Sequence, residues 1–253
     1  MRHVAIVLSA LMLTGFIRAD DGRDIVERAM KARSDNTDLL DKQKCQAVVM
    51  VGKIVHGNNL ESDATFELKS AWPWQQHWQH ELDLPTGKSR STMGFNIDRA
   101  WTQRLTLPAE DMDLSGIDEF RTEIYGRWLA TLYPLKDKAF TFAMLKDGRV
   151  GDEDVSVVRV TLRLRPDIIM SFSKKTGHLL KVAYRASEGG AEVRKEHHFS
   201  DYRDFDGLKL PTRLVDYKQP VNAPPAKAAE WKISSYKFLD KLPADTFEKP
   251  EKK

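Results

Sequence analysis

The feature that most restricts the fold is a tight turn in the last third of the chain, between two segments of strand-like composition. Residues 201–211 hold three aspartates and Gly207 ahead of a Lys-Leu-Pro segment, and a third strand-like segment closes on residues 242–247. Glycine permits the positive φ that a hairpin turn uses, and proline is typical of the edge of a sheet. This region therefore predicts the end of an antiparallel meander.

Alternation of apolar and polar residues extends this prediction to most of the chain. Ala64, Phe66 and Leu68 alternate with polar residues, which indicates a strand with one buried face. Trp74, Trp78 and Leu82 share one side of the next segment in the same way. In all we expect about eleven strands, at residues 64–69, 74–83, 91–97, 100–105, 140–146, 155–164, 168–172, 179–186, 192–202, 210–217 and 230–239, with the proline-containing residues 218–229 as a loop.

A helix is predicted near the start of the chain. Asp21 is its expected cap, and Lys31 and Arg33 suit the negative C-terminal end of its dipole. Its apolar face consists of Ile25, Val26, Ala29 and Met30.

A second helix is predicted to interrupt the strands. Ser115 and Asp118 have the spacing of a capping box, and Pro134 stops the helix. Such a helix has to bury its apolar stripe, and the economical arrangement is a strongly curved sheet whose concave face the helix covers. The stripe consists of Ile117, Phe120, Ile124, Trp128 and Leu132.

Residues 1–19 have the three parts of a secretory signal peptide. Arg2 and His3 are basic, residues 4–17 are apolar, and Ala19 stands where cleavage is expected. The apolar run is shorter than the ~20 residues that cross a bilayer, and no later segment of the sequence is apolar enough to do so. We therefore expect an exported, periplasmic protein whose mature part, residues 20–253, forms a single domain, because no long linker or repeat divides it.

The cysteine count and the charge balance restrict function further. Cys45 is the only cysteine and precedes an apolar run, so we expect a buried structural thiol. The 40 Lys and Arg residues are balanced by 37 Asp and Glu residues, and the sign of charge alternates along most segments. Nucleic-acid binding needs basic residues gathered on one face, so no nucleic-acid partner is expected.

Motifs for catalysis are incomplete. Gly87-Lys-Ser89 resembles the end of a phosphate-binding loop, but Leu82 stands where that loop needs a glycine. Ser171 and Lys174 have the spacing of a serine-lysine pair, but they lie on a predicted strand, where the two side chains would not meet. We therefore predict no catalytic residue, and a protein that is not an enzyme.

Candidate metal ligands are equally incomplete. Two histidine pairs lie on predicted strands: His77 with His80, and His197 with His198. In each pair the two side chains would point to opposite faces of the strand, so we expect surface histidines rather than a metal site. Three aspartates lack the spacing of a calcium loop and are expected to cap a turn: Asp201, Asp204 and Asp206. No metal and no other cofactor is predicted.

Three late motifs carry a resemblance to a known family. They are Tyr202-x-x-x-x-Gly207-x-x-x-Pro211, Trp231-Lys-Ile-Ser-Ser-Tyr236 and Pro243-x-x-x-Phe247. With these motifs, the export signal and the internal helix, the chain resembles the lipoprotein carrier and receptor superfamily, the LolA/LolB/RseB-like proteins. Residue matches are confined to residues 193–247, whereas the layout matches over most of the mature chain. The resemblance implies a half-open antiparallel β-barrel, mainly β with helices on its concave face.

The same resemblance implies a carrier or chaperone that holds acyl chains in a hydrophobic cavity without covalent chemistry. Its partner would be an acyl-chain lipid or a lipoprotein. The sequence leaves two alternatives open: the same residues could simply fill a core, and the same curved sheet could serve an envelope protein-interaction or sensor module. The candidates for the cavity are Phe66, Leu68, Trp74, Trp78, Leu82, Phe120, Ile124, Trp128, Leu132, Met170 and Phe172.

Overall fold

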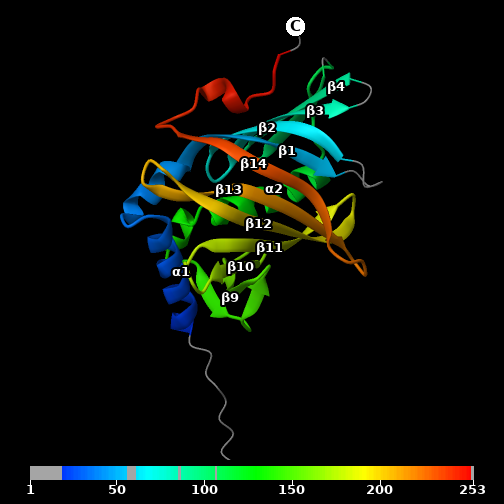
Figure 1. The fold of residues 1–253 in the computed structure, drawn as a ribbon. Helices are drawn as coiled ribbons and strands as arrows, with labels where there is room; N and C mark the ends of the chain where they lie inside the picture. The colour runs from blue at the N-terminus through cyan, green and yellow to red at the C-terminus, as the bar shows by residue number, and fades with distance from the viewer. Residues whose placement is uncertain (1–18, 56–60, 85–86, 106, 252–253) are drawn as a thin grey trace, which may run out of the picture.

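A computed structural model describes residues 19–55, 61–84, 87–105 and 107–251, and their strands form one antiparallel sheet. Along the sheet the order is β6-β5-β4-β3-β2-β1-β14-β13-β12-β11-β10-β9-β7, with β8 paired to β9. The end strands β6 and β7 do not pair with each other, so the curved sheet stays open (Figure 1). The strands are β1 (Cys45–Val55), β2 (Glu61–Ala71), β3 (Gln75–Leu84), β4 (Gly87–Asn96), β5 (Arg99–Arg104), β6 (Glu110–Asp111), β7 (Thr141–Met144), β8 (Gly148–Val150), β9 (Glu153–Thr161), β10 (Ile168–Ser173), β11 (Leu179–Glu188), β12 (Ala191–Phe205), β13 (Leu208–Pro220) and β14 (Ala226–Phe238).

This architecture confirms the predicted fold class, a half-open antiparallel sheet with helices. Each of the eleven expected strands overlaps an observed one, and the structure adds β1, β6 and β8, which makes fourteen in the described residues. The prediction missed β1 because its apolar run, Ala47–Val51, does not alternate. The expected loop at residues 218–229 was too long, since β13 reaches Pro220 and β14 starts at Ala226.

Two α-helices and three short 3₁₀ segments accompany the sheet. The helix α2 lies on the inner side of the curved sheet, behind β13 and β14 in Figure 1, and α1 lies beside the ends of the strands β9 to β11. The elements are α1 (Ala19–Arg33), α2 (Leu114–Ala130), η1 (Thr37–Lys44), η2 (Tyr133–Lys136) and η3 (Ala244–Phe247).

The predicted helix ends need correction. The described part of α1 already includes Ala19, so Asp21 lies inside the helix rather than at its cap. The cap of α2 is Asp113, whose Oδ1 accepts the Gly116 backbone N–H at 2.8 Å, and Ser115 donates to the same carboxylate at 3.0 Å. An aspartate at the N-cap position thus replaces the expected Ser115 capping box.

The C-terminal end of α2 also differs from the prediction. The helix stops at Ala130, with Thr131 as its cap, and Leu132 follows with a left-handed φ of 67°. Leu132 is therefore buried just beyond the helix rather than on its stripe.

The core consists of two apolar clusters, with α2 contributing to both. The first cluster gathers α1, β7 and β9 to β13 around Tyr125 and Leu129 of α2. The second gathers β1 to β5, β13 and β14 around Ile117, Phe120 and Ile124 of α2. The helix is therefore an internal element, and both of its apolar sides are covered.

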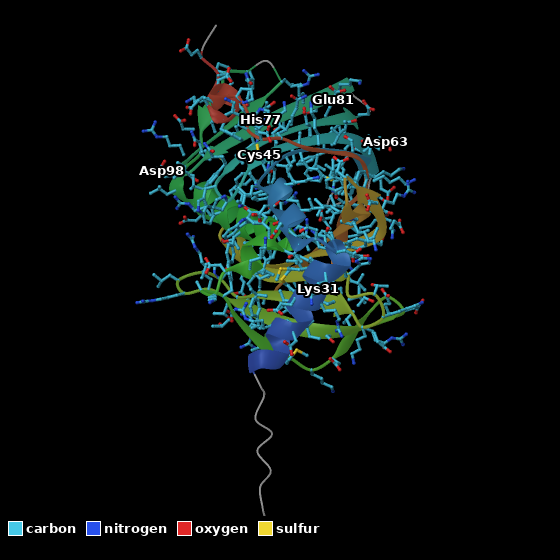
Figure 2. The ribbon with its side chains drawn as sticks, turned by 90° about the vertical axis from the view of Figure 1, so that its left-hand side faces the viewer. Lys31, Cys45, Asp63, His77, Glu81 and Asp98 are labelled. Atoms are coloured by element: carbon cyan, nitrogen blue, oxygen red, sulfur yellow. The ribbon has the colours of Figure 1, made fainter. Side chains whose placement is uncertain are left out.

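The remaining sequence predictions concern the surface and the ends of the chain. Cys45 is buried, as expected, whereas Lys31, Asp63 and Asp98 are exposed (Figure 2). In the described part of the chain, no helix combines the length and apolar character needed to cross a membrane. The predicted signal peptide, residues 1–19, lies outside the described residues except for Ala19.

Candidate functional site

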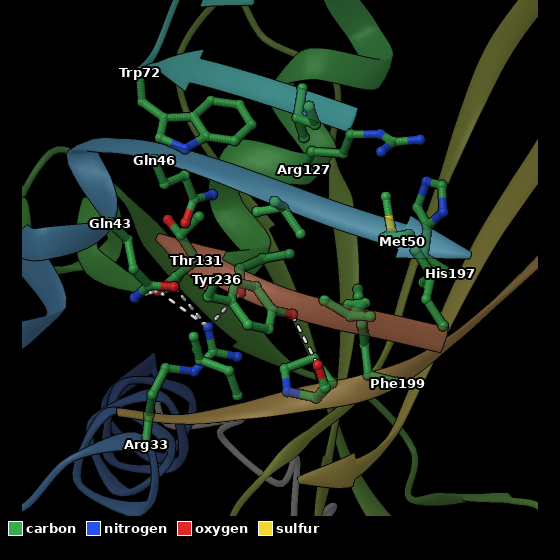
Figure 3. A pocket seen from close by; sticks show the side chains of 17 residues that line it. Arg33, Gln43, Gln46, Met50, Trp72, Arg127, Thr131, His197, Phe199 and Tyr236 are labelled. Carbon is green, nitrogen blue, oxygen red and sulfur yellow. Dashed lines mark hydrogen bonds between the residues drawn. The ribbon is translucent and has the colours of Figure 1, made fainter. Parts of the chain in front are cut away.

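A pocket lies on the inner face of the sheet, beneath the C-terminal half of α2 (Figure 3). Strands β1, β2 and β12 to β14 form its floor, while α1, η1 and α2 supply residues at its rim. Its volume is about 100 Å³. It is lined by Arg33, Gln43, Gln46, Val48, Met50, Leu68, Trp72, Arg127, Ala130, Thr131, His197, Phe199, Leu210, Pro211, Leu214, Ile233 and Tyr236.

The pocket lies at the boundary between the two clusters. Leu210 belongs to the first cluster. The second cluster supplies five further lining residues, namely Val48, Met50, Leu68, Leu214 and Ile233. The floor of the pocket is thus continuous with the apolar layer between α2 and the sheet.

One end of the pocket is polar. Arg33, the last residue of α1, is only 4% exposed. Its Nη1 donates to Gln43 Oε1 at 3.3 Å and to the backbone oxygens of Ala130 at 3.1 Å and Thr131 at 3.4 Å. The Gln43 side-chain amide also donates to Thr131 O, at 3.0 Å. This end therefore fastens α1 and η1 to the last turn of α2.

A network of charged side chains borders the pocket on the other side. Arg127 and His197 line this pocket and also a neighbouring polar cavity that contains Glu123, Lys195 and Asp216. Glu123 of α2 accepts hydrogen bonds from Arg127 Nη2 and Lys195 Nζ, both at 3.0 Å. The helix is therefore tied to β12 through the ion pair of Glu123 with Lys195, which has little exposure to solvent.

His197 continues this network within the sheet. Its Nδ1 is 2.6 Å from Asp216 Oδ1, and its Nε2 is 2.9 Å from the Tyr184 hydroxyl. The indole of Trp231 donates to the other oxygen of Asp216 at 3.1 Å. His197 is buried, so the expectation of a surface histidine was wrong for this residue, because its two polar partners, Asp216 and Tyr184, compensate for the loss of water.

The pKa values of the two carboxylates reflect their partners. Burial on its own would raise the pKa of Glu123, but the charges of Lys195 and Arg127 outweigh it and hold that pKa well below the usual value. For Asp216, burial is likewise outweighed by His197 and Arg127, and its pKa is lowered. Both groups are therefore ionised at neutral pH, and α2 is held to the sheet by full charges.

The cavity candidates fall into four groups. Leu68 lines the pocket. Four others pack together in the second cluster, where Trp78 and Phe120 have ring centroids 4.4 Å apart; the four are Phe66, Trp78, Phe120 and Ile124. Three more belong to the first cluster, namely Leu132, Met170 and Phe172. The last three are partly buried and pack against one or both clusters: Trp74, Leu82 and Trp128. Ligand contact by all eleven candidates, Leu68 included, stays a prediction.

The incomplete motifs have structural explanations. Ser171 is buried on β10, whereas Lys174 pairs with Asp147 at 2.5 Å. Asp204 Oδ1 accepts the Gly207 backbone N–H at 3.0 Å, as expected for a turn-capping aspartate. Among the described residues, no cluster of three His, Cys, Asp or Glu side chains could hold a metal ion.

Sequence reasoning missed the polar end of the pocket. Arg33 was assigned to the dipole of its own helix, whereas its contacts are with the end of another helix. Gln43, Gln46 and Trp72 gave no signal, because polar residues and single tryptophans beside a strand are ordinary surface or core residues. Only the buried position of Arg33 identifies this end.

The comparison with solved structures settles the fold. A LolA superfamily protein from Nitrosomonas europaea superimposes with a TM-score of 0.55 at 14% identity, over 90% of this chain and 97% of that chain. A putative outer membrane lipoprotein-sorting protein domain from Vibrio parahaemolyticus gives a TM-score of 0.53 at 18% identity, over 91% and 97%. The chain has the LolA-type fold. No family model and no curated protein matches the sequence.

The same fold occurs under another family description. A DUF1329 family protein from Desulfovibrio piger gives a TM-score of 0.56 at 14% identity, over 91% of this chain and 97% of that one. At such identities the likeness concerns the fold.

Within this LolA-type fold, the late motifs that suggested the resemblance are structural neighbours. Tyr202 is opposite Pro211 in the β12 to β13 ladder, and the Tyr236 hydroxyl donates to Pro211 O at 2.8 Å. Trp101 Nε1 donates to Phe247 O at 3.1 Å, which fastens η3 to β5. Pro211 and Tyr236 also line the pocket, so these motifs build one wall of the candidate site.

Proposed function

We propose that this protein is an exported, periplasmic carrier or chaperone that holds the acyl chain of a lipid or lipoprotein and performs no covalent chemistry. In this proposal, residues 1–19 are removed as a signal peptide and residues 20–253 act as one domain. The observation that carries the proposal is the mainly apolar pocket between α2 and the concave face of a LolA-type sheet. A solved structure with this fold is named as a lipoprotein-sorting domain, which supports the same choice.

The size of the pocket indicates how a chain would enter. A volume of about 100 Å³ is far below the ~300–1,000 Å³ of sites that enclose a drug-sized ligand. The conformation described therefore corresponds to a nearly closed state. A longer chain requires α2 to move away from the sheet, and the pocket would then extend into the second cluster.

The predicted cavity residues acquire a role in this opened state. Leu68 lies on the pocket floor and belongs to the same cluster as Phe66 and Trp78. We propose that an acyl chain entering past Leu68 runs along these two aromatic side chains, beneath Phe120 and Ile124 of α2. Each buried methylene contributes about 0.8 kcal/mol, so a partly enclosed chain would already be retained.

Filling the pocket tests the proposal. Leu214 is buried on the floor, and Leu214→Trp would occupy the volume that an acyl chain needs. Wild-type protein should bind the neutral apolar dye N-phenyl-1-naphthylamine saturably, and hexadecanoic acid should displace it. Leu214→Trp should weaken both by about tenfold or more, a loss of at least ~1.4 kcal/mol.

Leu164→Trp is the matched control, because Leu164 is 91% exposed. It adds the same indole at the surface and should bind the dye as the wild type does. Folding of both variants is checked by thermal unfolding, since overpacking can cost ~1–3 kcal/mol. Absence of saturable binding by folded wild-type protein would refute the carrier function, and equal binding by Leu214→Trp would refute this pocket as the site.

A further inference from the structure

The polar end of the pocket holds a buried positive charge without a negative partner. The three acceptors around Arg33 Nη1 are the Gln43 amide oxygen and the carbonyls of Ala130 and Thr131, all of them neutral. Among the described residues, no carboxylate lies within 4 Å of this guanidinium. Arg127, by contrast, pairs with the carboxylate of Glu123 at 3.0 Å.

An uncompensated buried charge is costly. Charged side chains are seldom fully buried without an opposite charge, because the lost hydration is recovered only through pairing and complete hydrogen bonding. The neutral acceptors and the negative end of the α2 dipole compensate in part. A carboxylate at this position would compensate more strongly, since charge-assisted hydrogen bonds are roughly twice as strong as neutral ones.

A second donor at the same end has no partner. Trp72 lines the pocket, and its indole Nε1 is buried with no hydrogen-bond acceptor among the described residues. Its backbone N–H donates to Lys44 O at 2.8 Å, next to Gln43, which accepts from Arg33. Trp72 and Arg33 therefore belong to one end of the pocket (Figure 3). A buried indole N–H ordinarily has an acceptor, so an acceptor atom of a bound ligand would satisfy this donor.

We propose that this end of the pocket binds the carboxylate of an unesterified long-chain fatty acid, with Arg33 and Trp72 as its donors. The inference rests on the proposed acyl-chain function and specifies the ligand class. The head group lies at the polar end beside Arg33, and the chain extends along Leu68 and Leu214 into the layer beneath α2. A carboxylate is smaller than a phosphodiester and takes up less of the about 100 Å³ available.

Binding of the carboxylate is coupled to the position of α2. In the described conformation Arg33 donates to Ala130 O, at the last residue of α2, and to Thr131 O, at its C-cap. The carboxylate of the ligand takes over these donors. Loss of these bonds frees the last turn of α2 to move away from the sheet. The head group thereby promotes the opening that its own chain requires.

The test compares hexadecanoic acid with methyl hexadecanoate as competitors of N-phenyl-1-naphthylamine at pH 8. It uses the exported protein. The two competitors share the chain and differ in charge. Wild-type protein should bind the acid at least about tenfold more tightly, as expected for a charge-assisted contact. Trp72→Phe keeps the ring and removes the N–H, so it should weaken binding of the acid by about threefold to tenfold and that of the ester less.

Two further variants complete the test. Arg33→Gln should reduce the preference for the acid to near unity; if it fails to fold, Trp72→Phe still decides. Trp101→Phe is the matched control, because Trp101 is a buried tryptophan that does not line the pocket and whose indole N–H is already bonded to Phe247 O. Equal affinity of the wild type for acid and ester would overturn this inference while leaving the acyl-chain function intact. Failure of both competitors to bind would refute the proposed function itself.

Discussion

The Arg33 guanidinium donates from Nη1 to the backbone oxygen of Ala130 at 3.1 Å, across 97 residues of sequence. This contact connects the end of α1 to the last turn of α2, where the exposed carbonyls of a helix carry partial negative charge. It therefore sets how firmly α2 closes over the pocket.

Replacement of this arginine should loosen the end of α2. Arg33→Met keeps much of the buried aliphatic volume but leaves the carbonyls of Ala130 and Thr131 without this donor. An unsatisfied buried group costs about 1–3 kcal/mol, so the free energy of unfolding should fall by that amount in a denaturant titration. Hydrogen exchange should also accelerate in the last turn of α2. Arg28→Met, at an exposed position of the same helix, should change neither quantity; unaltered exchange in Arg33→Met would refute the role of Arg33 as a fastener.

The packing of α2 against β11 depends on Gly126. A Cβ at this position would lie 2.7 Å from Cε1 of the Tyr184 ring, which is itself fixed by its hydrogen bond to His197. Gly126→Ala should destabilise the protein, because overpacking costs about 1–3 kcal/mol and outweighs the ~1 kcal/mol that alanine gains in a helix. Thermal unfolding measures the difference.

Gly116 provides the matched control on the same helix. A Cβ there would lie 3.0 Å from the flexible end of the Met112 side chain, which can move aside. Gly116→Ala should therefore be neutral or stabilising, by up to ~1 kcal/mol. The opposite order of the two variants would contradict the close approach of α2 to β11.

Acidification should weaken the fold through Glu196 on β12. The hydrogen bond from His198 and the charges of Lys181 and Arg194 lower the pKa of Glu196 from 4.5 to about 2. Because the folded pKa is depressed, this contribution to stability is fully present above pH 4.5 and is lost as the pH falls toward about 2. It should amount to at most about 3 kcal/mol.

The measurement is the free energy of unfolding of the wild type and Glu196→Gln across this pH range. The variant should show a shallower decline, since it lacks the titrating carboxyl group. Glu192→Gln, at an exposed position of the same strand, should retain the wild-type decline. Identical slopes for Glu196→Gln and the wild type would show that Glu196 does not contribute.

The strands could be predicted because their signal is local. Ala64, Phe66 and Leu68 alternate along the sequence and do so in the sheet, as alternate residues of β2 are buried. The stripe Ile117, Phe120 and Ile124 likewise identified α2 and its buried face. Whether such residues enclose a cavity or fill a core depends on how closely α2 approaches the sheet, and that distance has no local signal.

The polar end of the pocket could not be predicted for a related reason. Arg33, Gln43 and Trp72 come from α1, from η1 and from the turn after β2, and they meet only when those elements are assembled. A basic residue at the end of a helix already has an ordinary explanation in the helix dipole. Burial, which only the folded chain reveals, distinguishes Arg33 from such a residue.

The predicted signal peptide leads to a further prediction at the start of the chain. Ala19 has the small side chain that cleavage prefers at the preceding position, so the exported protein should begin at Asp20. Intact-mass analysis of exported protein checks this. Retention of Met1 in that material would contradict export by a cleaved signal.

Native mass spectrometry of protein purified without detergent, followed by organic extraction, tests the acyl-chain function most directly. We expect part of the wild-type protein to carry an added mass corresponding to an acyl-bearing molecule, the extract to contain that molecule, and Leu214→Trp to lack it. Folded wild-type protein that has the mass of the polypeptide alone, yields no acyl chains and takes up no added fatty acid would contradict the acyl-chain function.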